Sequence, residues 1–102
     1  MKLLLYVTYL DKTTDILASI TTLKSQVSNI IEPDFGLLDE LLKLNVLTQR
    51  QLAKVRSKET MYERNDALLD LLVSEDQCDK FMKALRLTDQ QHVVNLIAQK
   101  GG

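Results

Sequence analysis

The sequence predicts an all-α bundle in one domain, and three observations support this fold class. First, 45% of the 102 residues are hydrophobic and 26% are charged, the proportions of a soluble globule with one modest core. Second, leucine dominates the apolar residues and recurs at spacings of three and four, which is the period of a buried helix face. Third, the chain has only three glycines and one proline, fewer turn residues than an all-β fold needs.

The first helix is predicted over residues 13–31, and the whole domain over residues 13–100. Pro33 ends this helix because it disfavours helical geometry at Glu32. Residues 1–12 are predicted to be an N-terminal extension or the start of a lengthened first helix. The apolar run within Met1–Leu10 is too short to cross a bilayer, although a secreted helical factor with this segment as its leader remains an alternative. The apolar stripe of the first helix consists of Ile16, Ile20, Leu23, Val27 and Ile30 with Ile31.

The second and third helices form a compact helix–loop–helix unit. Asp34 is predicted to cap the second helix, which closes at Asn45 and buries Leu37, Leu38, Leu41 and Leu42. The pair Val46-Leu47 is predicted to point into the core. Thr48 then caps a short third helix that buries Leu52 and Val55.

Three further helices complete the bundle. The fourth starts near residues 58–60, the fifth opens at Ser74 or Glu75, and the sixth opens at Thr88 and stops at Gly101. Connections of about two to six residues make neighbouring helices nearly antiparallel. The residues predicted to face the core are Met61, Leu68, Leu69, Leu71, Leu72, Cys78, Phe81, Met82, Leu85, Val93, Val94, Leu96 and Ile97.

The chain offers no combination of residues that predicts an enzyme. Cys78 lies on the apolar stripe of its helix and His92 falls in another helix, so a catalytic dyad is not expected. One His and one Cys are too few for a typical zinc site, and no glycine-rich phosphate loop occurs. We therefore expect neither catalysis nor a cofactor. A single cysteine cannot form an internal disulfide, which favours an intracellular protein.

Charged residues of opposite sign gather in different parts of the sequence. We expect both groups to face solvent, where complementary patches guide docking and fix its register. A domain with both signs can also stack head to tail on copies of itself. The predicted acidic patch consists of Asp34, Asp39 and Glu40. The predicted basic patch consists of Arg50, Lys54, Arg56 and Lys58.

A helix-turn-helix DNA-binding protein is the main alternative. Residues 47–53 are similar to the first half of that motif, and the basic cluster that follows could contact phosphates. Against it, no glycine marks the turn, residues 60–66 carry acidic side chains, and the net charge is −1. We therefore expect no nucleic-acid partner and no membrane association.

Five motifs occur in order along the chain: Gly36-Leu37-Leu38-Asp39-Glu40-Leu41-Leu42, Val46-Leu47-Thr48 with Val55, Leu68-Leu69-Asp70-Leu71-Leu72, residues 78–85 (CDKFMKAL) and His92-Val93. With these motifs the chain resembles a caspase recruitment domain, a member of the death-fold superfamily. The resemblance implies a six-helix antiparallel Greek-key bundle with a bent first helix. It also implies a cytoplasmic, non-catalytic module that pairs with another recruitment domain, or with itself as an oligomer or filament, in apoptotic or inflammatory signalling.

In this family an acidic surface on the second and third helices often contacts a basic surface on the first and fourth. The resemblance assigns the acidic surface to Asp39 and Glu40, and the basic surface to Lys24 and Arg64. The fourth helix departs from the pattern because it carries acidic residues and places Asn65 on its inward stripe, where the amide would need partners. Partial inversion of the charge pattern would make Arg50, Lys54 and Arg56 the donors and Glu75 with Asp76 the acceptor. A decoy that blocks the assembly of a larger protein is a further interpretation.

Overall fold

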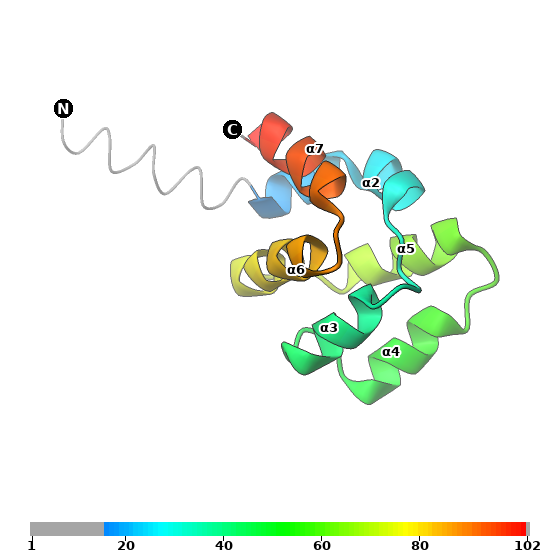
Figure 1. The fold of residues 1–102 in the computed structure, drawn as a ribbon. Coiled ribbons are helices and arrows are strands. Elements are labelled where there is room, and N and C mark those ends of the chain that lie inside the picture. The colour runs from blue at the N-terminus through cyan, green and yellow to red at the C-terminus, as the bar shows by residue number, and fades with distance from the viewer. Residues whose placement is uncertain (1–15, 102) are drawn as a thin grey trace, which may run out of the picture.

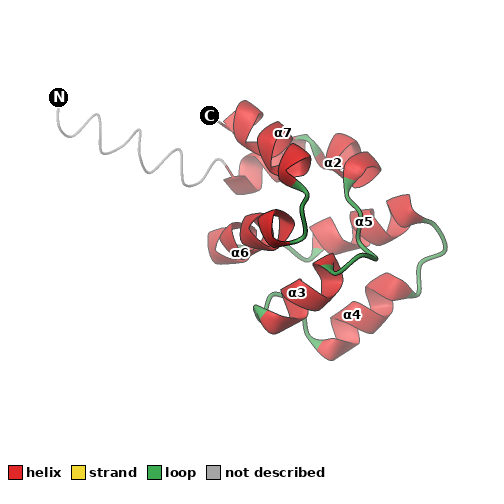
Figure 2. Cartoon of the chain, viewed as in Figure 1, coloured by secondary structure: helices red, strands yellow, loops and turns green. Residues whose placement is uncertain are grey.

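The computed structural model describes residues 16–101, and every regular element in this range is a helix (Figure 1), with no strand among the coloured segments (Figure 2). The predicted all-α fold is confirmed. The N-terminal extension and the start of the first helix lie outside the described residues. The labelled helices are α2 (Lys24–Ile30), α3 (Leu37–Lys43), α4 (Gln49–Arg56), α5 (Met61–Asp70), α6 (Glu75–Leu87) and α7 (Gln91–Gly101).

The helices enclose one core in a closed ring. Helix α2 packs against α5 and α7, α3 packs against α4 and α6, and the ring is completed where α4 meets α5 and α6 meets α7. Figure 1 shows the same arrangement, in which helices far apart in the sequence, such as α2 and α7, lie side by side. Each helix therefore buries only part of its surface, and its outer face is left to solvent.

The predicted first helix is broken at Leu23. Residues 16–22 are helical, Leu23 has turn geometry with φ −97° and ψ 13°, and α2 follows at once. The hydroxyl of Thr21 donates a 3.0 Å hydrogen bond to the carbonyl of Leu17, a contact that often bends helices. The break agrees with the bent first helix that the resemblance implied.

The core consists almost entirely of the aliphatic residues that the periodicity predicts, grouped around Phe81. Met61 was predicted to face the core, and this prediction is wrong, because its side chain is 37% exposed at the first position of α5. Four polar residues are also buried, and Asn65 is one of them, as its place on the inward stripe predicts. The buried polar residues are Ser19, Ser28, Asn65 and Gln90.

Hydrogen-bonded caps fix where α4, α5 and α6 begin. The side chains of Thr48, Thr60 and Ser74 each accept a hydrogen bond from the backbone N–H three residues later. In return the Gln or Glu at that third position accepts from the backbone N–H of the cap, so two donors that the helix leaves unpaired are satisfied. The predicted cap at Thr48 and the start of α6 at Ser74 are confirmed.

The end of α3 is fixed by a left-handed residue. Asn45 has φ 62°, and the next residue, Val46, donates a 2.9 Å hydrogen bond back to the carbonyl of Leu41. This pattern is a Schellman motif, which turns the chain sharply inward. Val46 and Leu47 are consequently buried, as predicted.

The N-terminus of α3 differs from the prediction. Gly36 is the N-cap, with φ 99°, and no side chain caps the helix. The carboxylate of Asp34 instead pairs with Arg64 at 3.2 Å, across the start of α5. Asp34 lies two residues before the N-cap and contacts a residue far along the chain, which the local sequence spacing did not reveal.

The connection between α6 and α7 is held by Gln90, three residues beyond the end of α6. The side-chain amide of Gln90 accepts from the N–H of Glu32 at 2.8 Å and donates to its carbonyl at 3.0 Å. The same amide donates to the hydroxyl of Thr88 at 3.1 Å. Thr88 therefore closes α6 and does not open the last helix, which begins at Gln91.

Replacing Gly36 with alanine should destabilise the domain by about 1 kcal/mol, because a residue with a Cβ is strained in a left-handed backbone conformation. The new Cβ would lie 3.6 Å from Cγ2 of Thr88, an ordinary contact, so the cost is conformational and not steric. Thermal denaturation measures the effect. Asn45→Gly is the control, because glycine adopts the φ of 62° at this position without strain, so the variant should be as stable as the wild type or slightly more stable. A Gly36→Ala protein that melts with the wild type would contradict this explanation.

Candidate protein-binding surface

Three cations form a row along α4 and the bend that follows it. Arg50 and Lys54 are four residues apart on α4, which places them on one side of the helix, and Lys58 lies in the bend two residues after its end. Arg50 and Lys54 are exposed, and Lys58 is half-buried. No ion pair joins any of the three to another charge within residues 16–101. We call this set the α4 cation row. It presents positive charge to an incoming partner without first giving up an internal contact.

Arg56, the fourth predicted basic residue, faces α3 instead. Its guanidinium donates a 2.9 Å hydrogen bond to the carboxylate of Asp39, and both side chains are about half exposed. The predicted acidic and basic patches therefore meet at the junction of α3 and α4.

The other two predicted acidic residues also have partners inside the domain. Asp34 pairs with Arg64 at 3.2 Å, and Glu40 pairs with Lys43 one helical turn away at 3.5 Å. Asp34 and Lys43 are exposed in these pairs, whereas Arg64 and Glu40 are only 20% and 25% exposed. The acidic patch therefore starts with partners inside the domain, unlike the α4 cation row.

Arg64 and Lys24, the predicted secondary cations, each connect two separate parts of the bundle. Arg64 donates to the carbonyl of Lys58 at 3.0 Å as well as pairing with Asp34, so it ties the α4–α5 connection to the turn before α3. Lys24 of α2 bridges Asp66, at 3.3 Å, and Asp70 of α5. The hydrogen bond to Asp70 is the main reason that the pKa of Lys24 is raised above its usual 10.5.

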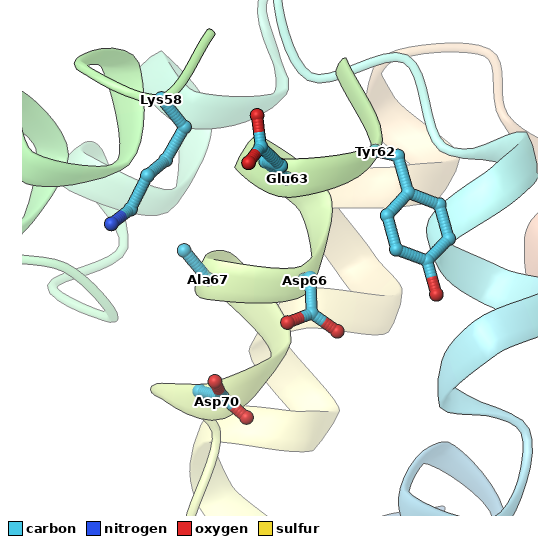
Figure 3. A pocket seen from close by; sticks show the side chains of 6 residues that line it. All are labelled: Lys58, Tyr62, Glu63, Asp66, Ala67 and Asp70. Atoms are coloured by element: carbon cyan, nitrogen blue, oxygen red, sulfur yellow. The ribbon is translucent and has the colours of Figure 1, made fainter. Parts of the chain in front are cut away.

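The outer face of α5 is acidic. Figure 3 shows Glu63, Asp66 and Asp70 along one side of this helix, with Lys58 across a hollow and Tyr62 on the side towards α2. The hollow measures about 240 Å³. A recognition helix that met DNA here would present carboxylates to phosphates, which disfavours the helix-turn-helix alternative.

Glu75 and Asp76 lie in the first turn of α6, where negative charge complements the helix dipole. Asp76 is mostly exposed and pairs with Lys80 at 3.2 Å, four residues along the same helix. Glu75 is half-buried. The structure therefore separates the two: Asp76 can face a partner, while Glu75 belongs partly to the body of the domain.

Cys78 and His92 are not brought together in a reactive arrangement. Cys78 is fully buried on α6, whereas His92 is exposed on α7. Burial raises the pKa of Cys78 to about 11, with smaller contributions from Glu75 and Asp79, so the thiol is protonated and unreactive at neutral pH. In the part of the chain described, no cluster of three His, Cys, Asp or Glu residues could hold a metal ion.

We expect a thiol reagent such as Ellman's reagent to label Cys78 only in the unfolded protein. The raised pKa also predicts the sign of a pH effect. The protonated thiol favours the folded state, and this contribution is complete below pH 9.0 and is lost as the pH rises towards 11. Labelling rates in buffer and in denaturant test the first point, and chemical denaturation at pH 8 and pH 10.5 tests the second. Equal labelling rates in both solvents would show that the thiol is accessible.

Comparison with known proteins identifies this fold. Residues 27–100 match the family model of the caspase recruitment domain. The chain belongs to the caspase recruitment domain family. Members of this family are non-catalytic interaction modules with a six-helix death fold. The match begins within α2, at residue 27, and covers α3–α6 and most of α7. No curated protein and no solved structure matches the chain significantly. Within residues 16–101, no helix is both long and apolar enough to cross a membrane.

Sequence reasoning missed the ion pairs that join the recruitment domain's charges across helices. Asp39 and Arg56 are 17 residues apart on different helices, and Asp34 and Arg64 are 30 residues apart. A signal did exist, because the antiparallel α3–α4 unit was predicted and places the start of α3 near the end of α4. Combining that topology with the positions of Asp39 and Arg56 would have suggested their contact.

Proposed function

We propose that this caspase recruitment domain binds the recruitment domain of another protein, or of a further copy of itself, through the α4 cation row. The observation that carries the proposal is the lack of internal ion pairs for Arg50, Lys54 and Lys58 within the described residues, in a domain whose family works by pairing. Family membership supports a cytoplasmic role in the assembly of apoptotic or inflammatory signalling complexes.

The acidic patch is the proposed second surface. Asp39 is 63% exposed and Asp34 is 46% exposed, so a partner's arginine or lysine can reach both carboxylates even though each holds an internal partner. Exchange of the exposed pair between Asp39 and Arg56 for a pair with the partner costs little and provides directional docking more than affinity.

We place the acidic patch at the α3–α4 junction and the α4 cation row towards α5, where Lys54 and Lys58 line a hollow. Lys24, Arg64, Glu75 and Asp76 are the proposed flanking contacts. An acidic face on the partner would meet the α4 cation row. The α5 face, with Glu63, Asp66 and Asp70, has the charge that such a contact requires, which supports a recruitment domain of similar charge pattern as the partner.

The test is binding to a panel of purified recruitment domains, this one included, by biolayer interferometry. The wild type should bind at least one member, and the double variant Arg50→Glu, Lys54→Glu should weaken that binding at least about tenfold, because like charges now face each other. Lys83→Glu is the matched control, since it reverses an exposed cation on α6, away from the row. Unchanged binding of the double variant, or no binding to any member, would refute the proposal.

A further inference from the structure

Ser57 continues the face of α4 that carries the α4 cation row. It is the C-cap of this helix and keeps helical geometry, with φ −74° and ψ −13°. Ser57 therefore lies on the same side as Arg50 and Lys54, because positions i, i+4 and i+7 share one helical face. Lys58 is the next residue in the chain. A hydroxyl thus lies among three cations that hold no ion pair within residues 16–101.

The hydroxyl of Ser57 is accessible and makes one hydrogen bond. The side chain is exposed in the connection of residues 57–60 between α4 and α5, which Figure 1 shows at the outer edge of the bundle. Its Oγ donates at 2.6 Å to the carbonyl of Lys54. The same carbonyl accepts from the backbone N–H of Ser57 at 3.3 Å, so it keeps a partner when the hydroxyl turns away. A larger group on Ser57 can therefore point to solvent without leaving this carbonyl unpaired.

Two other exposed hydroxyls have carboxylates nearby, which would repel a phosphate. The hydroxyl of Thr60 contacts the carboxylate of Glu63 at 3.1 Å. Ser25 follows Lys24, whose ammonium group is already held by two carboxylates of α5. Ser57 instead belongs to the face of the α4 cation row, where the positive charge is available to an anion.

We propose that Ser57 is a phosphorylation site and that its phosphorylation blocks binding through the α4 cation row. The inference rests on the proposed function, because it assigns a control to the same surface. The enzyme is a serine/threonine kinase with an acidic substrate groove, since the chain around Ser57 is basic at Lys54, Arg56 and Lys58. In the transfer, Oγ of Ser57 forms a bond to the γ-phosphorus of ATP. The bond from that phosphorus to the leaving oxygen of ADP breaks, and the hydroxyl proton passes to a base of the kinase.

A phosphate at Ser57 would reverse the charge at the end of the α4 cation row. It carries about −1.5 to −2 charges at neutral pH and three acceptor oxygens. Lys54, on the preceding turn, and Lys58 are the cations that can pair with these oxygens. The three positive charges of the row are thereby reduced to about one, and an acidic face on the partner meets a phosphate. Negative charge is unfavourable at a helix C-terminus, but the two ammonium groups beside the phosphate offset this effect, so the fold should be retained.

The test starts from kinase treatment of the purified domain. The wild type is incubated with ATP, Mg²⁺ and each of a panel of purified kinases that prefer basic substrates, and modified residues are located by mass spectrometry. At least one kinase should phosphorylate Ser57. By biolayer interferometry, the phosphorylated protein should bind its partner recruitment domain at least about tenfold more weakly than the untreated protein. Ser57→Ala is the matched control, and after the same treatment it should bind like the untreated wild type.

Circular dichroism establishes whether the phosphorylated domain is folded, and loss of its helical signal would overturn the inference because unfolding would then explain the weaker binding. No phosphorylation of Ser57 by any kinase of the panel, or phosphorylation that leaves binding unchanged, would also overturn it. If the double variant Arg50→Glu, Lys54→Glu weakens binding while phosphorylation of Ser57 does not, the inference fails and the proposed function stands. If phosphorylation weakens binding but the double variant binds normally, the role of the α4 cation row fails and Ser57 remains a modification site. If no recruitment domain binds the wild type, both fail.

Discussion

Replacing Leu41 with aspartate is expected to unfold the domain. Leu41 is fully buried on the inner face of α3, and its carbonyl also accepts the hydrogen bond that closes this helix. Truncation of a buried leucine to alanine alone costs about 2–5 kcal/mol, and an unpaired carboxylate adds a large desolvation penalty. The sum reaches the total stability of a typical domain, about 5–15 kcal/mol. Circular dichroism at neutral pH should show the loss of most helical signal.

Leu87→Asp is the matched control, because it makes the same change at a leucine that is 59% exposed at the end of α6. Negative charge at a helix C-terminus is unfavourable by about 0.3–1 kcal/mol, so this variant should melt only slightly earlier than the wild type. A folded Leu41→Asp protein with a wild-type melting temperature would show that α3 is not an essential part of the core.

Replacing Asn65 with alanine is expected to destabilise the domain by about 2–4 kcal/mol, because two hydrogen bonds are lost and two buried carbonyls are left without a donor. The amide nitrogen of Asn65 on α5 donates to the carbonyls of Ser28, at 2.7 Å, and Ile31, at 2.9 Å. These carbonyls belong to the last turn and the C-cap of α2, so Asn65 holds the end of α2 against α5. Thermal denaturation should show a melting temperature lower by roughly 10–20 °C.

Asn29→Ala is the control within α2, since Asn29 is exposed, and it should change stability by less than about 0.5 kcal/mol. Asn65→Asp provides a second readout. Its carboxylate would face two carbonyl oxygens in the core, so its pKa should rise and the variant should be more stable at pH 5 than at pH 7. If Asn65→Ala and Asn29→Ala melt together, the amide is not what holds α2 in place.

The elements of this fold that depend on nearby residues were predictable from the sequence. The caps at Thr48 and Ser74, the stop at Asn45 and the inward pair Val46-Leu47 each follow from contacts within about five residues. The core was predictable for a related reason, because helical period decides which face of each helix is apolar. Met61 breaks this rule because it occupies the first turn of α5, where the periodic stripe extends beyond the core.

Features that depend on contacts between distant segments were not predictable. The buried position of Asn65 followed from its stripe, but its partners at the end of α2 are 34 and 37 residues away. The two hydrogen bonds between the side chain of Gln90 and the backbone of Glu32 join residues 58 positions apart, and nothing near Gln90 in the sequence indicates them. The candidate surface divides in the same way: the basic cluster of α4 is visible in the sequence, whereas the pairing of Asp34 with Arg64 requires the tertiary structure.

The charged residues of the candidate surface form two groups, those that hold an ion pair inside the domain and those with no described ion pair. Asp34, Asp39, Arg56 and Arg64 stabilise the contacts between helices, while the α4 cation row contributes to no described ion pair. Reversal of Arg50 and Lys54 should therefore change binding without changing the fold, since no intramolecular ion pair is lost.

The most direct test of the central claim is the affinity of the wild-type domain for a recruitment domain that binds it, measured as salt is raised. Between about 0.01 M and 1 M salt the Debye length falls from about 30 Å to about 3 Å, which screens an exposed cation row from its partner. If the α4 cation row carries binding, affinity falls steadily over this range while the melting temperature changes little. An affinity that is constant or rises with salt would contradict the account.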